Sequence, residues 1–346
     1  MSAGPMSMAL VASITVALSA LIAGGVAYQW LGRRRDARRW PPPGRMVPIG
    51  DRRRVHLFVL GDGTPAVVFE AGISATSLNW RGVQQTIAPT TRAVAYDRSG
   101  LGWSDPGTTP RTASNIAGEL RAALREDGVE PPYILVGHSF GGLLVRRFAS
   151  LYPAEVAGLV LLDALQPEEW SPLLERQRRM LATGTRLARR GALLARIGLV
   201  RVALRLLMAG SRRLPRAIGT CASGPGATVI GRLAGEVGKM PRELWPIVAA
   251  HWSNPGSFLA MAAHFAALPA SADEMRGAAP ADGIPVTVLT AGKNPPVPEE
   301  AIRAIAHNAR HVVARESGHW IHLDQPELVV DAILEMVAAA RHAKTG

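Results

Sequence analysis

Short apolar runs alternate with helical patterns along most of the chain. The predicted strands, each rich in Val, Leu or Ile, are Arg54–Leu60, Ala66–Glu70, Ala93–Asp97, Tyr133–Gly137, Gly158–Asp163, Val286–Thr290 and His311–Ala314. Helical patterns follow several of them, most clearly Ala113–Glu126, Gly141–Leu151, Pro298–Asn308 and Pro326–Arg341. Because continuous apolar runs are typical of strands buried on both faces, this alternation predicts an α/β fold with a mostly parallel sheet flanked by helices.

The alternation stops over residues 166–282, where the pattern is helical throughout. We expect a helical cap there, inserted between a first core segment (51–165) and a second (283–346). From Arg176 to Arg216 this cap is rich in arginine, has no acidic residue, and interleaves its arginines with apolar positions. Such a segment either covers the sheet with its arginines solvated, or forms a basic amphipathic lid on anionic lipid.

The first 32 residues carry no charged side chain, and the apolar run Met8–Leu31 would be about 36 Å long as a helix, enough to cross a hydrocarbon core of about 30 Å. It predicts a transmembrane anchor at 1–32, followed by a basic, proline-rich linker at 33–50. A secretory signal peptide is the alternative, but it requires a positive amino-terminal region and a shorter apolar core. The arginines between Arg33 and Arg39 predict a single-pass protein of the cell membrane with a cytoplasmic catalytic domain.

The composition narrows the class further. The chain has 346 residues, 48% of them hydrophobic, which excludes disorder over most of its length. Its single cysteine, Cys221, cannot form an internal disulfide or a cysteine-based zinc site. The net charge of +12 suggests an acidic partner, yet no nucleic-acid-binding motif accompanies it. We therefore expect a lipid bilayer rather than nucleic acid, contacted by the apolar segment and, in the second of the two alternatives for the cap, by the basic lid as well.

The segment Gly137–Gly141 has the pattern G-x-S-x-G and lies between a predicted strand and a predicted helix. A serine on such a turn, here Ser139, is exposed at the top of the sheet, and the glycines remove side chains that would collide. The free N–H groups of the following helix point toward developing negative charge. We therefore predict that Ser139 is a nucleophile.

A serine hydroxyl needs a base and a carboxylate that orients the base. His319, in the loop before the last helix, is the predicted base, and His322 is the alternative. Asp163, at the end of the strand after the serine, is the predicted acid. The loop carrying Glu299 and Glu300 is the other possible source of the acid.

Together these features resemble a known family. From about Arg52 to Arg341 the chain is similar to cap-bearing serine hydrolases of the α/β-hydrolase fold, of the bacterial esterase and lipase type. The resemblance rests on the serine turn, on the loop Tyr96–Ser104 and on the segment Ser317–His319. It implies the chain order serine, acid, histidine, which Ser139, Asp163 and His319 follow.

The resemblance also implies an oxyanion hole formed by the backbone N–H groups of Ile73 and Phe140, with Gly72 allowing close approach of substrate. His138 and Trp103 are further candidates for the substrate pocket. No metal ion and no cofactor is implied.

The sequence departs from the family at two places. Relatives usually carry an aspartate after the seventh strand, where this chain has Asn294 and Pro295. Relatives often have His-Gly after the third strand, where this chain has the run Phe69–Ser74. Backbone donors tolerate a changed side chain, so the second departure leaves an oxyanion hole possible.

The expected activity is hydrolysis of a lipophilic carboxylic ester through an acyl-enzyme. The same residues could serve an iminopeptidase, a thioesterase, a carbon–carbon hydrolase or a perhydrolase. A receptor of this fold that binds a ligand without turnover is the competing class. A serine nucleophile excludes the epoxide hydrolases and haloalkane dehalogenases of this fold, because those enzymes need a carboxylate nucleophile.

Overall fold

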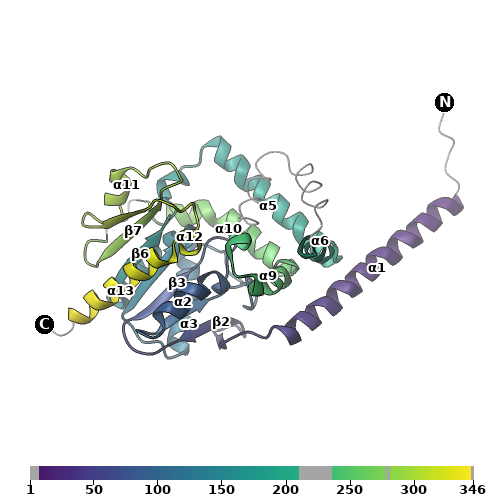
Figure 1. The fold of residues 1–346 in the computed structure, drawn as a ribbon. Helices are drawn as coiled ribbons and strands as arrows, with labels where there is room; N and C mark the ends of the chain where they lie inside the picture. Colours follow the sequence, from purple (N-terminus) through teal and green to yellow (C-terminus); the bar gives the residue numbers. More distant parts are fainter. Residues whose placement is uncertain (1–7, 210–235, 277, 279–280, 344–346) are drawn as a thin grey trace.

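The computed structural model describes residues 8–209, 236–276, 278 and 281–343, and Figure 1 shows their arrangement. A central sheet with helices on both faces forms the body, and one long helix projects away from it. Cys221 and the end of the arginine-rich segment lie outside the described residues. The helices are α1 Met8–Arg39, α2 Arg81–Ile87, α3 Ala113–Glu126, α4 Phe140–Leu151, α5 Glu175–Arg196, α6 Leu199–Met208, α9 Trp245–Trp252, α10 Pro255–Asp273, α11 Glu299–Arg303, α12 Ile321–Asp324 and α13 Pro326–His342.

The sheet has eight strands in the order β1-β2-β4-β3-β5-β6-β7-β8. They are β1 Arg45–Pro48, β2 Arg54–Leu60, β3 Ala66–Glu70, β4 Ala93–Tyr96, β5 Tyr133–His138, β6 Val156–Leu162, β7 Val286–Ala291 and β8 Arg310–Ala314. β2 pairs antiparallel with β1 and with β4, and the remaining pairs are parallel. The predicted mostly parallel sheet is confirmed, with each predicted strand present to within two residues at either end.

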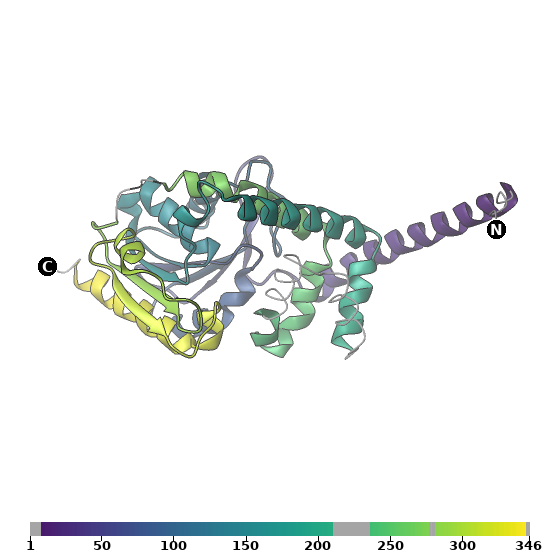
Figure 2. The ribbon, with the colours of Figure 1, turned by 90° about the horizontal axis from the view of Figure 1, so that it is seen from above.

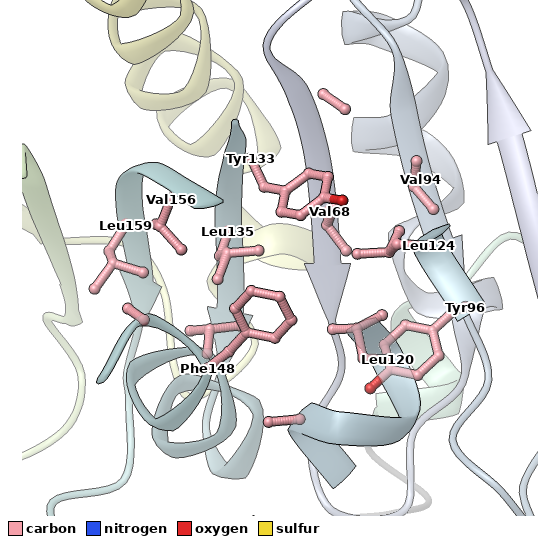
Figure 3. Packing of buried hydrophobic residues seen from close by; sticks show 14 of the residues in the cluster. Val68, Val94, Tyr96, Leu120, Leu124, Tyr133, Leu135, Phe148, Val156 and Leu159 are labelled. Atoms are coloured by element: carbon pink, nitrogen blue, oxygen red, sulfur yellow. The ribbon is translucent and has the colours of Figure 1, made fainter. Parts of the chain in front are cut away.

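Successive side chains of the central strands enter two separate cores, which explains their continuous apolar runs. Val68 and Leu135 face α3 and α4 and pack with Phe148 (Figure 3). Val67 and Ile134 point to the opposite face, where α2 and α13 cover the sheet. Because the central strands are parallel, their carboxyl ends lie at one edge of the sheet, where the loops with the candidate site residues follow.

The helices between β6 and β7 form the cap. In Figures 1 and 2, α5 runs along α10 above the body, and α6 and α9 lie beside the projecting helix. α5 approaches α10 closely because two of its residues are glycines. A Cβ on Gly191 would lie 2.6 Å from the Phe258 ring, and one on Gly184 would lie 3.4 Å from the Phe265 ring.

The prediction that residues 33–50 form a linker is wrong, because α1 and β1 both extend into this segment. α1 continues through the arginines to Arg39, because Arg and Ala favour a helix and the next helix-breaking residue is Pro41. Residues Arg45–Pro48 then form β1, the edge strand of the sheet. α1 itself is long enough and apolar enough to cross a membrane, by length and composition.

One predicted helix is much shorter than expected. The pattern predicts a helix over Pro298–Asn308, but α11 ends at Arg303. The carbonyl oxygen of Ile305 accepts a hydrogen bond from the Ala281 N–H at 2.7 Å instead of one from a further helical turn. A contact with the segment before β7 therefore ends this helix.

Candidate active site

Ser139 occupies the sharp turn between β5 and α4. Its backbone has φ 55° and ψ −120°, a conformation that a residue with a side chain rarely adopts. The flanking glycines explain how the turn closes. A Cβ on Gly137 would lie 2.6 Å from the Gly141 carbonyl oxygen, and one on Gly141 would collide with the carbonyl oxygen of Glu70. The predicted strand–turn–helix context of Ser139 is therefore present.

His319 and Asp163 are in direct contact. His319 Nδ1 donates a hydrogen bond to Asp163 Oδ2 at 2.6 Å, although the residues are far apart in the sequence. Asp163 directly follows β6 with φ 41°, so its strand ends one residue earlier than predicted. The turn directs the carboxylate across the end of β7 toward His319.

Two further donors hold the Asp163 carboxylate. Asn294 Nδ2 donates to Oδ2 at 2.9 Å, and the Ala291 N–H donates to Oδ1 at 3.3 Å. The sequence analysis treated Asn294 only as a departure from the family pattern. The structure gives it a part in orienting Asp163, which its place after β7 could have suggested.

The alternative acids from the loop after β7 are turned outward. Glu299 is exposed and pairs with Arg303 on its own helix. Glu300 is exposed as well. Among the described residues, neither carboxylate contributes to the cavity wall beside Ser139.

Ser139 and His319 line a common cavity of about 890 Å³. Of the predicted site residues, Gly72, Ile73, His138 and Phe140 also line it. The cap supplies much of the remaining wall through apolar side chains, namely Trp170, Met180, Leu181, Phe265 and Leu268. The cavity therefore joins the serine turn, the loop after β3 and the cap in one space.

The loop after β3 passes close to Ser139. A Cβ on Gly72 would lie 3.9 Å from Ser139 Cβ and 3.2 Å from His138 Nδ1, so only glycine fits this approach without displacement. Phe140 N–H begins α4 directly beside the serine. The predicted oxyanion residues Ile73 and Phe140 therefore lie on the two segments that flank Ser139.

A buried arginine holds this loop. Arg98 donates to the carbonyl oxygen of Ala71 at 2.7 Å, to the carbonyl oxygen of Gly72 and to the Glu70 carboxylate. The Tyr96 hydroxyl also donates to Glu70, and burial raises the pKa of Glu70. The sequence analysis used the segment around Arg98 only for the resemblance and assigned it no role.

The ring of His138 packs against the rings of two other histidines, His319 and His322. The His138 ring centroid lies 4.7 Å from that of His319 and 4.6 Å from that of His322, and His138 Nε2 donates to the His319 carbonyl at 2.8 Å. Burial lowers the pKa of His138 well below its usual value and that of His322 to about 3. His322 also stacks on Trp80 and, within the described residues, is not part of the cavity wall. This arrangement leaves His319 as the histidine beside Ser139 and Asp163.

Trp103 is not where the sequence predicts it. Its indole N–H donates to the carbonyl of Trp40, and its ring packs on His56 and His251. Among the described residues, it does not line the cavity with Ser139. The Asp97 carboxylate turns the loop away by accepting a hydrogen bond from the Trp103 N–H at 3.1 Å.

The cavity contains one buried acid that the sequence did not single out. Glu236, from the cap, accepts a hydrogen bond from Asn79 Nδ2 at 2.7 Å, and burial raises its pKa to about 7. Within residues 8–209, 236–276, 278 and 281–343, no group of three or more His, Cys, Asp or Glu side chains could hold a metal ion.

Curated relatives resemble parts of this chain. It is 37% identical over 114 residues to an AB hydrolase superfamily protein of Gibberella zeae, a match that covers 32% of this chain and 35% of that protein. It is 34% identical over 103 residues to the uncharacterized protein YqjL of Bacillus subtilis, covering 30% and 41%. The chain thus spans less than half the length of these two relatives.

Solved structures resemble it over most of its length. The epoxide hydrolase CorEH superposes with a TM-score of 0.63 at 18% identity, covering 85% of this chain and 97% of that one. A thermophilic esterase from Thermogutta terrifontis superposes with a TM-score of 0.57 at 21% identity, with the same coverage. At these identities the likeness concerns the fold. Residues 65–326 match the family model of the alpha/beta hydrolase fold, and the chain therefore belongs to that family.

Proposed function

We propose that this protein is a serine hydrolase that cleaves a carboxylic ester, with Ser139 as nucleophile, His319 as base and Asp163 as the residue that orients His319. The observation that carries the proposal is the 2.6 Å contact between His319 Nδ1 and Asp163 Oδ2, beside a serine on a strained turn in the same cavity. With Nδ1 donating to the carboxylate, Nε2 of neutral His319 is free to accept the serine proton.

The reaction then follows from these groups. Ser139 Oγ attacks the acyl carbonyl while its proton moves to His319, and the carbonyl oxygen becomes negatively charged. The N–H groups of Ile73 and Phe140 stabilise that oxyanion. Collapse releases the alcohol, which takes the proton from His319, and leaves an acyl-serine. Water, deprotonated by His319, then attacks the acyl-serine and releases the acid.

The cavity wall favours a lipophilic acyl group. Its cap side combines aromatic and aliphatic side chains with the charged residues Glu175, Arg176, Arg179 and Glu236, and a space of about 890 Å³ accommodates a medium-sized ligand. An esterase is among the solved structures of similar fold. The serine at position 139 disfavours the epoxide hydrolase chemistry of the other neighbour, which requires a carboxylate nucleophile.

The amino-terminal helix serves in this proposal as an uncleaved membrane anchor. Gln29 and Asp36 on α1 bind Arg201 of the cap, a side chain that is 5% exposed. Removing α1 as a signal peptide would take away both partners of Arg201 and the helix surface that covers its side chain, which favours a helix that stays in place. The arginines that follow Gly32 favour a cytoplasmic body, and the exposed arginines of α5 favour contact with anionic lipid rather than nucleic acid.

The test uses the full chain in detergent. The purified protein is treated with a fluorophosphonate, and its intact mass is measured beside that of Ser139→Ala. The expected result is one adduct on the parent and none on the variant, followed by turnover of p-nitrophenyl esters in a series of acyl lengths. No adduct on the folded parent would contradict an activated serine and favour a ligand receptor. An adduct without ester turnover would redirect the search to thioesters, amides or carbon–carbon bonds.

A further inference from the structure

The amino-terminal helix does not leave the body freely but crosses the cap at close range. A Cβ on Gly25 of α1 would collide with the carbonyl oxygen of Ile197, and one on Gly198 would lie 2.9 Å from the Gly25 carbonyl oxygen and from the Tyr28 ring. Both glycines are at the crossing of α1 with the α5–α6 turn. The two segments therefore touch backbone to backbone, which fixes their spacing.

Polar contacts lock this crossing. Arg201 of α6 donates to Gln29 Oε1 at 2.9 Å and forms an ion pair with Asp36. Arg205 of α6 donates to the Tyr28 hydroxyl at 2.8 Å. Arg201 is buried and binds two side chains of α1, so it holds α6 beside α1 more firmly than a surface ion pair would.

The uncharged part of α1 continues through this crossing. The residues from Met8 to Gly24 are exposed, burial begins at Gly25, and the first charged side chain is that of Arg33. A hydrocarbon core of about 30 Å takes up about 20 apolar residues, and the uncharged run of α1 includes Gly25–Tyr28. A bilayer that takes up this run reaches the level of the α5–α6 turn and of α6 (Figure 1).

The faces of α6 agree with that position. Arg201 and Arg205 face α1, while Val200, Leu204 and Leu207 are half-buried on another face. A third face is apolar and exposed, with Leu199 52%, Val202 41% and Leu206 46% accessible. These three residues follow the spacing of one helical stripe. An apolar stripe flanked by arginines is the pattern of a helix that lies in the interface of a bilayer.

We propose that α6 lies in the head-group layer of the membrane that α1 crosses, with Leu199, Val202 and Leu206 against the acyl chains of phospholipids. The inference rests on the proposed anchoring role of α1 and adds the depth at which the cap sits. Because α5 continues into α6 and lines the cavity at its other end, the membrane also fixes the cap over the site.

The experiment measures the depth of single labels in vesicles. The full chain carries Cys221→Ser and one new cysteine, modified with nitrobenzoxadiazole, and is reconstituted into vesicles of phosphatidylcholine and phosphatidylglycerol. Quenching is compared for lipids brominated near the head group and near the chain end. Leu206→Cys reports on α6, Leu18→Cys reports on the exposed part of α1, and Val313→Cys is the matched control. Val313 is 47% exposed on β8, at the opposite sheet edge from the strand that follows α1.

We expect several-fold stronger quenching at Leu206 than at Val313, mainly by bromine near the head group, and quenching at Leu18 mainly by bromine near the chain end. Quenching at Leu18 but not at Leu206 would contradict the proposed position of α6 in the head-group layer and would still support α1 as a membrane anchor. No quenching at either label would overturn both, while labelling of Ser139 by fluorophosphonate remains a separate result. Arg201→Met should lower quenching at Leu206 but not at Leu18, and Arg186→Met, an exposed arginine of α5, is its control.

Discussion

Asn294 Nδ2 donates a hydrogen bond at 2.9 Å to the same oxygen of Asp163 that accepts from His319 Nδ1. The amide follows β7 and the carboxylate follows β6, two neighbouring parallel strands whose ends meet at one edge of the sheet. A carboxyl group at either position is thus within reach of the same histidine. The positions of acid and amide should therefore be exchangeable.

We predict that Asp163→Asn lowers kcat by about 10³–10⁴-fold, because the tautomer and orientation of His319 are lost. Asn294→Asp alone should also lower kcat, since two carboxylates would share one site and repel each other. The double variant Asp163→Asn, Asn294→Asp should recover a large part of the loss. Turnover of a p-nitrophenyl ester measures all three. A double variant no better than Asp163→Asn would mean that the two positions are not equivalent.

Arg98 should act on catalysis through the loop after β3. Its planar guanidinium binds the carbonyl oxygens of both Ala71 and Gly72, which fixes the backbone that leads into Ile73 at the cavity wall. Lysine cannot reproduce this fork. We expect Arg98→Lys to lower kcat by about 10²–10³-fold, as for loss of one oxyanion donor, with a much smaller change in KM. Arg146→Lys, on α4, is the control for loss of a guanidinium. The positioning role would be contradicted if Arg98→Lys changed kcat and KM no more than Arg146→Lys does. An unchanged kcat in Arg98→Lys would contradict it as well.

The features that the sequence could predict are those determined by local pattern. The central strands are apolar on both faces, so their runs are recognisable, and the turn at Ser139 needs its flanking glycines. Strand β1 was missed because it is a four-residue edge strand with one buried side chain, Val47. The continuation of α1 past Arg33 was missed because the run of arginines suggested a linker. Charged residues do not end a helix, and α1 stops only just before the helix-breaking Pro41.

The remaining features depend on contacts between distant segments. Trp103 packs away from the cavity because its indole N–H donates a hydrogen bond to the Trp40 carbonyl just after α1. The two residues are far apart in the sequence, so no local pattern encodes this contact. Arg98 and Glu236 are ordinary polar residues in the sequence and gain their roles from burial beside the cavity. Strand order could place Asp163 and His319 at one edge of the sheet, because parallel strands bring their carboxyl ends together, but it left the loop with Glu299 and Glu300 as another source of the acid.

Glu236 should make the folded protein less stable as the pH rises. Burial raises its pKa from 4.5 to about 7, so its contribution is fully present below about 4.5 and is lost as the pH rises through about 7. Glu236→Gln keeps the acceptor for Asn79 and cannot ionise. We expect the variant to gain up to about 3 kcal/mol over the parent between pH 4.5 and 8. Thermal unfolding in detergent at both pH values tests this, and a constant difference between the two proteins would contradict it.

His264 should act in the opposite direction. It is fully buried on α10, its Nδ1 donates to the Ala260 carbonyl at 2.7 Å, and its Nε2 has no hydrogen-bond partner among the residues that the structure describes. Burial, with the charges of Arg98 and Arg111, holds its pKa well below 6.5. The unfolded chain therefore binds a proton below about pH 6.5 that the folded protein does not, and stability falls as the pH drops, by up to about 1.4 kcal/mol per unit.

His264→Leu removes this contribution and retains an apolar side chain against Phe140. The fall in Tm from pH 7.5 to 5.5 should be smaller in His264→Leu than in the parent. Glu236 gains stability over the same interval, so the comparison is made within each protein and then between them. If His264→Leu retained the full fall in Tm, protonation of another buried group would have to account for the acid sensitivity.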